Sequence, residues 1–177
     1  MFYSGKMVSD QLDAALTNAV CEAEILDGSL LVLGNLVADT TYAASGDIEY
    51  DLYAGAAFKT NDKEVVLVDY AGISEGKIMD NNYKMGIKLY DLKVPAGVPT
   101  RVRRPHLHDK FWLSAANFEG SGLAAGKYGI PANGKYTHAV SGTLPESGYA
   151  IKILKEEDLT VGMQLHGKKY LCEVVQL

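Results

Sequence analysis

Short runs in which apolar and polar residues alternate, separated by turn residues, dominate the chain. The clearest example is the stretch from Lys88 to Phe118, where Pro-Ala-Gly-Val-Pro and Pro105 separate three such runs. Because side chains alternate between the two faces of a strand, this pattern predicts strands and turns. Strands are predicted at 29–37, 48–53, 64–70, 87–90, 101–103, 111–113, 134–140, 148–154 and 169–176. We therefore expect a mainly β chain, a small β-sandwich or β-barrel.

The first 24 residues follow a different pattern. Apolar residues recur at helical spacing between Val8 and Val20, with Ser9 or Asp10 placed to cap a short helix. The alternative is an extended N-terminal arm, because no stop signal precedes Asp27-Gly28. Such an arm would bury apolar residues on its own domain or on a neighbouring subunit. These residues are Phe2, Tyr3, Met7 and Val8.

Residues 25–177 are predicted to form a single β-rich domain. The chain has 177 residues, of which 47% are hydrophobic, so it can bury a substantial core. The segment 38–86 is mixed and polar, with a long Gly-, Asp- and Asn-rich excursion at 71–85, and it is interpreted as an inserted lobe. The charged run Lys155–Asp158 is interpreted as a solvated turn.

Composition narrows the classes of partner. A net charge of −5 and a pI near 5.3 argue against a general nucleic-acid-binding protein, which needs a basic surface. No apolar run approaches the roughly 20 residues of a membrane helix, and the N-terminus lacks a signal-peptide pattern. We expect a soluble protein made in the cytoplasm. Cys21 and Cys172 lie far apart and are expected to be buried residues or free thiols.

His106 and His108 are the one pair that a metal ion could use. On a strand, two histidines at i and i+2 share a face, as in the His-x-His pair of cupin-type metal sites. A cupin-type site also needs a Glu a few residues later and a further His on a later strand. Glu119 and His138 do not lie at a recognisable spacing from the pair. Pro105 also favours a turn, so exposed loop histidines are expected. A cupin-like metal enzyme or sugar-binding barrel that uses this pair, with His138, is the alternative.

Three arginines, Arg101, Arg103 and Arg104, form a basic patch in an acidic chain. On a strand, Arg101 and Arg103 would share one face. Two interpretations stay open. The patch could pair with carboxylates of an acidic partner, or it could be a solvated edge that discourages aggregation between strands.

Catalytic motifs are not evident in the sequence. It contains no G-x-S-x-G, H-E-x-x-H, P-loop or dinucleotide-binding pattern. The glycines between Gly120 and Gly126 suit turns, and the acidic pair Glu156-Glu157 lies in a charged run. The sequence alone therefore makes no case for an enzyme or for a cofactor.

Two stretches carry a resemblance to a known family. Ala23–Val37 contains Asp27-Gly28, an apolar run and Leu33-Gly34, and resembles the opening of small proteins encoded beside the shell protein of tailed bacteriophages. Asp109–Ser114, with the sequence Asp-Lys-Phe-Trp-Leu-Ser, resembles a later strand of the same proteins, and residues 170–176 resemble their terminal strand. These are head decoration, or cement, proteins.

The resemblance implies a small β-rich domain of the β-tulip type that coats the capsid exterior, without catalysis or cofactor. It implies the major capsid protein as the partner, and a homotrimer at three-fold positions, assembled in the host cytoplasm. An N-terminal arm often clamps adjacent shell subunits in this family, so residues 1–24 and the arginine patch are the expected interfaces. A tail or baseplate component of a phage is the alternative structural role.

Overall fold

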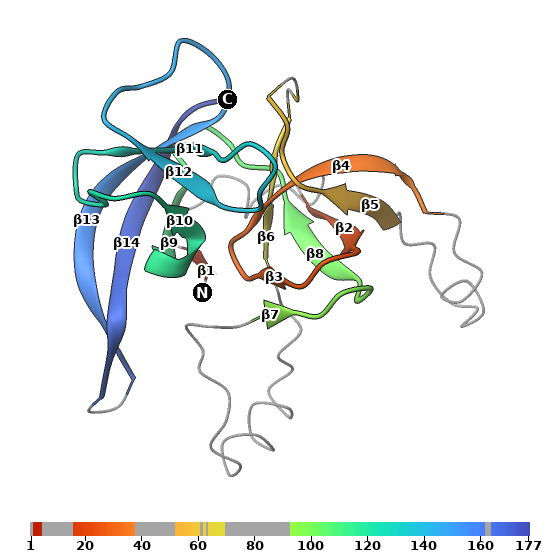
Figure 1. Ribbon diagram of the computed structural model, residues 1–177, viewed down its shortest axis with the longest axis horizontal. Coiled ribbons are helices and arrows are strands. Elements are labelled where there is room, and N and C mark those ends of the chain that lie inside the picture. The colour runs from red at the N-terminus through yellow and green to blue at the C-terminus, as the bar shows by residue number, and fades with distance from the viewer. Residues whose placement is uncertain are drawn as a thin grey trace.

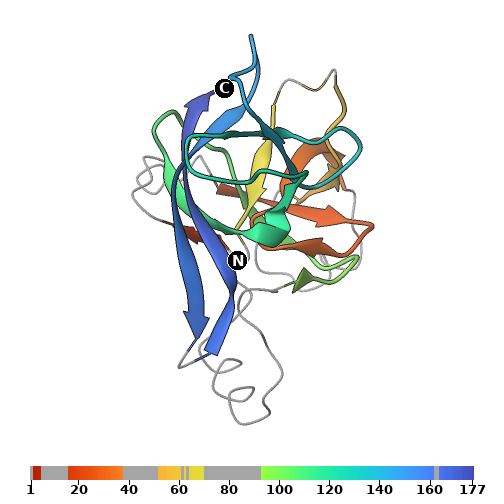
Figure 2. The ribbon, with the colours of Figure 1, turned by 60° about the vertical axis from the view of Figure 1, so that its left-hand side comes forward.

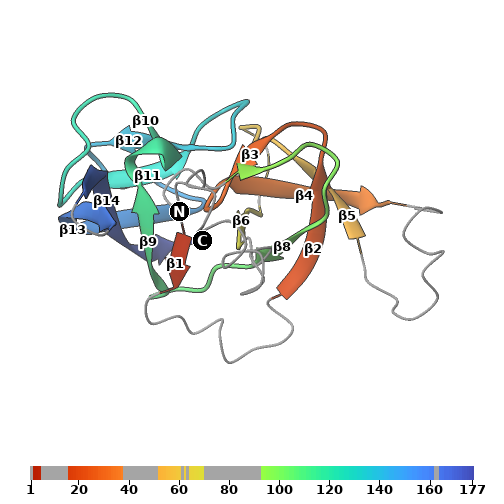
Figure 3. The same ribbon diagram turned by 90° about the horizontal axis from the view of Figure 1, so that it is seen from below.

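The computed structural model describes residues 2–4, 16–37, 52–60, 62, 64–69, 93–161 and 164–177. Within these ranges the chain is mainly β, and its one helical element is a 3₁₀ turn, η4 (Ala115–Asn117). The mainly β fold predicted from the alternating pattern is confirmed. Two larger sheets lie side by side, with the seven-stranded sheet on one side and the barrel on the other (Figures 1 and 3).

The first sheet has seven strands, in the order β1-β9-β14-β13-β11-β12-β10. Its members are β1 (Phe2–Ser4), β9 (Lys110–Ser114), β10 (Phe118–Glu119), β11 (Tyr128–Pro131), β12 (His138–Ser141), β13 (Ala150–Val161) and β14 (Gln164–Gln176). Neighbours are antiparallel except for β10 and β12, which are parallel. The two long strands β13 and β14 form its centre (Figure 2).

The second sheet is a closed five-stranded barrel, in the order β2-β5-β4-β6-β8. Its strands are β2 (Leu16–Cys21), β4 (Leu30–Leu36), β5 (Leu52–Ala56), β6 (Val66–Val68) and β8 (Thr100–Arg103). A small separate sheet pairs β3 (Ile25–Leu26) with β7 (Lys93–Val94). The barrel closes tightly, since a Cβ atom on Gly55 would lie 2.6 Å from the Cys21 sulfur.

Two clusters of buried side chains hold the sheets together. One fills the barrel and includes Leu31, Val66 and Val102. The other joins the sheets, because Leu30 and Leu67 of the barrel pack in one cluster with residues of the seven-stranded sheet. The latter include Phe111, Leu113, Phe118, Ile151, Ile153, Tyr170 and Val174. The alternation along β4 explains this arrangement, since Leu30 and Leu31 point to opposite faces and enter different cores.

Several predictions about segments are corrected. Leu16–Cys21, placed in an N-terminal helix or arm, forms barrel strand β2, because β8 and β5 pair with it on both sides. The described part of 38–86 is not a separate lobe, since β5 and β6 complete the barrel. The run Lys155–Asp158 is not a turn but the middle of β13, because lysines across the hairpin pair with its carboxylates.

Other predictions fall partly or wholly outside the described residues. Val8 and the rest of the predicted helix before Leu16 lie outside them, as do the excursion at 71–85 and the predicted strand at 87–90. Phe2 and Tyr3 are in β1, which extends the seven-stranded sheet by pairing with β9. An N-terminal arm was expected to pack either on its own domain or on a neighbouring subunit. The backbone of residues 2–4 lies on its own domain. Met7 and Val8 lie outside the described part.

Candidate functional site

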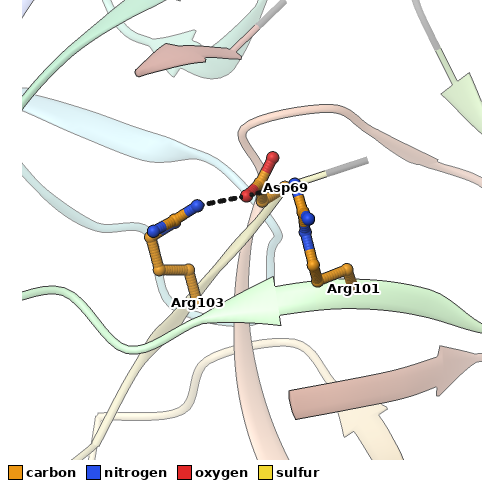
Figure 4. Close-up of polar contacts among 3 residues, drawn as sticks. All are labelled: Asp69, Arg101 and Arg103. Atoms are coloured by element: carbon orange, nitrogen blue, oxygen red, sulfur yellow. Dashed lines mark hydrogen bonds and ion pairs between the residues drawn. The ribbon is translucent and has the colours of Figure 1, made fainter. Parts of the chain in front are cut away.

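Arg101 and Arg103 both contact the carboxylate of Asp69 (Figure 4). The Nη2 atoms of Arg101 and Arg103 lie 2.9 and 2.7 Å from Asp69 Oδ2. Asp69 directly follows β6, which pairs with β8, and its backbone N–H donates to the Arg101 carbonyl at 3.0 Å. The two arginines therefore share one face of β8, as their i, i+2 spacing predicts.

This arrangement corrects the interpretation of the arginines as a basic patch on the surface. The side chain of Arg103 is only 7% exposed and that of Asp69 14%, so their ion pair lies inside the protein. Arg103 is therefore not available to an outside partner, whereas Arg101 is partly exposed and Arg104 is exposed. The sequence could not reveal the pairing, because Asp69 is 34 positions before Arg103. The arginines stabilise the closed barrel.

The two stretches that carry the family resemblance meet in the structure. The turn at Asp27-Gly28 leads from β3 into β4, and η4 directly follows β9. The side-chain amide of Asn117 donates to the backbone carbonyl of Asp27 at 2.9 Å. The Ser114 hydroxyl donates to the side-chain oxygen of Asn117, also at 2.9 Å. All three residues are buried. This polar junction, Asp27–Ser114–Asn117, fixes the barrel against the seven-stranded sheet.

The His106–Asp109 segment forms a turn, as Pro105 predicts. Asp109 is fully buried, and its carboxylate accepts the His106 backbone N–H at 2.8 Å. Two backbone hydrogen bonds fix the turn to β14. The backbone N–H of His108 donates to the Val174 carbonyl, and the backbone N–H of Val174 donates to the Asp109 carbonyl. His108 adopts a φ of 70°, and its exposed ring contacts Glu173 at 3.1 Å.

This turn does not assemble the metal-binding set of the alternative interpretation. His138 belongs to β12 and is fully buried, with its own partners in the core. Among the described residues no group of three or more His, Cys, Asp or Glu side chains is placed to hold a metal ion. Cys21 and Cys172 are buried free thiols, as predicted, and burial raises the pKa of both, that of Cys21 to about 11.

His138 is a buried core histidine, which the sequence analysis considered only as a metal ligand. Its Nδ1 atom lies 3.3 Å from the Asn117 carbonyl, which can only accept, so Nδ1 carries the proton. Its Nε2 atom lies 3.5 Å from the Tyr149 hydroxyl, which therefore donates to it. The ring packs against Phe118. Burial lowers the pKa of His138 to about 4, although the hydrogen bond to Asn117 acts in the opposite direction.

Three exposed leucines belong to segments that adjoin one end of the seven-stranded sheet, the end at which β13 begins and β14 finishes. They are among the four large hydrophobic side chains that are exposed in the described residues. Leu107 is in the turn bound to Val174, Leu144 is in the loop before β13, and Leu177 follows β14. They are 46–53% exposed, whereas the fourth, Leu36, lies at the end of β4 in the barrel. We call Leu107, Leu144 and Leu177 the leucine end.

The opposite end of the same sheet is charged. From the Asp158–Lys168 pair towards the hairpin tip, the described residues of β13 and β14 pair only with each other, and the hairpin extends past the other strands (Figures 1 and 2). Lys155 and Lys169 contact Glu157, and Lys168 contacts Glu156. Trp112 lies beneath the Lys169 ammonium group, 4.5 Å from the ring centre. The sheet therefore presents apolar chemistry at one end and ionic chemistry at the other.

Comparison with known proteins assigns no family, since no protein-family model, curated protein or solved structure matches this chain. In the described part of the chain there is no helix of the length and apolarity that crossing a membrane requires.

Proposed function

We propose that this chain is a structural protein of the virion, which binds the outer surface of a tailed-bacteriophage head and stabilises the shell. The observation that carries this proposal is the polar junction. Asp27 of the first resembling stretch and Ser114 of the second are linked by Asn117. Leu30 and Phe111, one from each stretch, also share a buried cluster. The resembling segments thus form one structural unit, as parts of a common fold would.

The leucine end supplies the chemistry that attachment to a shell needs. Exposed apolar side chains that gather in one place favour contact with another protein, since their burial releases about 25 cal/mol per Å². A specific contact needs about 800 Å² on each partner. Many equivalent sites on one particle also allow modest affinity per copy to give stable coverage. In this proposal the leucine end contacts the major capsid protein.

Charging the leucine end is expected to weaken attachment without unfolding the protein. Leu107→Glu combined with Leu144→Glu places two carboxylates in the proposed contact, where their desolvation should reduce particle binding at least about 10-fold. Binding is measured as the amount of protein that co-sediments with particles lacking their own copy. Leu36→Glu is the matched control, since Leu36 is similarly exposed but lies in the barrel. Equal binding by the double variant and the control would contradict this assignment.

A further inference from the structure

The loop between β12 and β13 is held to the core by one side chain. It spans residues 142–149, carries Leu144 of the leucine end and projects past the sheet near the C-terminus (Figures 1 and 2). Residues 142–148 are exposed, apart from Pro145, which is partly buried. Their only hydrogen bonds with described residues join Thr143 to Ser141, next to the loop. Tyr149, by contrast, is 5% exposed and packs in the cluster that joins the sheets, so it anchors the loop.

His138 holds this anchor from β12. The Tyr149 hydroxyl donates to Nε2 of His138 at 3.5 Å, and Nδ1 of the same ring donates to the Asn117 carbonyl at 3.3 Å. Asn117 in turn belongs to the polar junction that fixes the barrel against the seven-stranded sheet. Only a neutral imidazole has a nitrogen that accepts a hydrogen bond, since both nitrogens of imidazolium are donors. The anchor therefore depends on the protonation state of His138. We call Tyr149 and His138 the latch.

The surroundings of His138 disfavour a positive charge. The ring is fully buried, and burial lowers its pKa to about 4. The titratable groups on the elements around it are Tyr149, Tyr170, Cys172, Asp109 and Glu119. Burial raises the pKa of the two tyrosines and of the cysteine, so these three are neutral in acid. Asp109 accepts the His106 backbone N–H, and Glu119 accepts from Lys135 and Thr137. A protonated ring is therefore better solvated when Tyr149 moves away and water enters.

The loop can move without the sheets. Gly142 and Gly148 lie at its two ends, and Gly148 has a φ of 85°, a conformation that glycine adopts without steric cost. Opening the loop breaks the contacts of one buried side chain, whereas unfolding exposes both cores. We propose that protonation of His138 releases Tyr149 and opens the 142–149 loop while both sheets stay folded. Acid then moves Leu144 out of the leucine end. This displacement detaches the protein from the shell, a consequence that rests on the proposed function.

Pepsin tests the latch in purified protein, because it cleaves next to aromatic residues in acid. The Tyr149–Ala150 bond becomes accessible when the loop opens, whereas the Phe111–Trp112 bond in β9 reports unfolding of the sheet. When cleavage is slow relative to closing, its rate follows the open population. The pKa of His138 is about 4 in the closed state and returns to 6.5 in the open state. Cleavage after Tyr149 should therefore rise at least about 10-fold between pH 5.5 and pH 4, relative to a peptide of residues 142–153.

The variant H138F/Y149F is the matched control. It removes the titrating ring together with the hydroxyl that the ring binds, and it keeps an aromatic residue at the cleaved bond. Its cleavage after position 149 should change less than about 2-fold over the same pH range. Equal pH dependence in the variant and the wild type would overturn the proposal. The wild type alone also decides it, since cleavage that rises equally at the Phe111–Trp112 bond, or at neither bond, would refute a local opening.

The consequence for attachment is measured separately, on particles that carry either the wild type or H138F/Y149F. Washing at pH 4 should release the wild type and leave the variant bound. Release of both proteins, or of neither, would contradict a role of the latch in attachment. Because the pepsin experiment needs no particles, failure of the latch is distinct from failure of the proposed function.

Discussion

Replacing Asp69 with alanine is expected to lower the free energy of unfolding by about 3–5 kcal/mol, the range for removing one partner of a buried ion pair. Asp69 binds both Arg101 and Arg103, and the Arg103 side chain is 7% exposed. The substitution leaves two guanidinium groups close together without the carboxylate between them. Urea unfolding measures the change, as a lower midpoint with an unaltered dependence on denaturant.

The control for this prediction is an ion pair at the surface. Glu24 and Lys93 lie 2.8 Å apart, and both side chains are about half exposed. Glu24→Ala should therefore cost less than about 1 kcal/mol. If Asp69→Ala costs no more than Glu24→Ala, the paired arginines do not stabilise the barrel in the way described.

Acidification is expected to destabilise the protein through His138. The pKa of this buried imidazole is lowered from 6.5 to about 4, so the unfolded chain binds a proton more readily than the folded one. The full contribution of the neutral imidazole is present above pH 6.5 and is lost as the pH falls towards 4. Because one pKa unit corresponds to about 1.4 kcal/mol, the lowering of the pKa from 6.5 to about 4 corresponds to a loss of about 3 kcal/mol.

His138→Phe separates this effect from other titrations in the same range. Glu119 has a pKa lowered by its hydrogen bonds from Lys135 and Thr137, and it also loses stabilising contacts in acid. That carboxylate is present in both proteins, so the difference in unfolding free energy between wild type and variant reports His138. The wild type should lose more stability than the variant between pH 6.5 and pH 4. Parallel pH profiles would contradict a buried neutral histidine.

The strands were largely predictable because their alternation is local. Residues 29–37 and 169–176 were assigned from their own pattern and correspond to β4 and β14. The charged run at 155–158 was wrongly predicted as a turn, because that prediction also used only the local sequence. Its partners Lys168 and Lys169 lie in the next strand, so nothing within the run itself indicates a ribbon. The N-terminal spacing likewise suggested a helix, but pairing with β5 and β8 places residues 16–21 in the barrel.

The candidate sites depended on contacts between distant positions. The arginine patch was visible in the sequence, but its partner Asp69 was not, and that residue turns a surface feature into a buried one. His138 was considered only as a metal ligand, because its burial depends on contacts with Phe118 of β10, Asn117 of η4 and Tyr149 of the loop before β13, which are distant from it in the sequence. The leucine end combines residues from three separate segments, which only the folded sheet brings to one end.

The most direct test of the proposed function is the copy number of this protein relative to the major shell protein in purified particles from its source. Quantitative mass spectrometry with labelled standards for both proteins provides the ratio. A ratio near one, or near a simple fraction set by three-fold positions, is the result that the proposal predicts. A handful of copies per particle would assign the protein to the tail instead, and complete absence from particles would contradict a structural role in the virion.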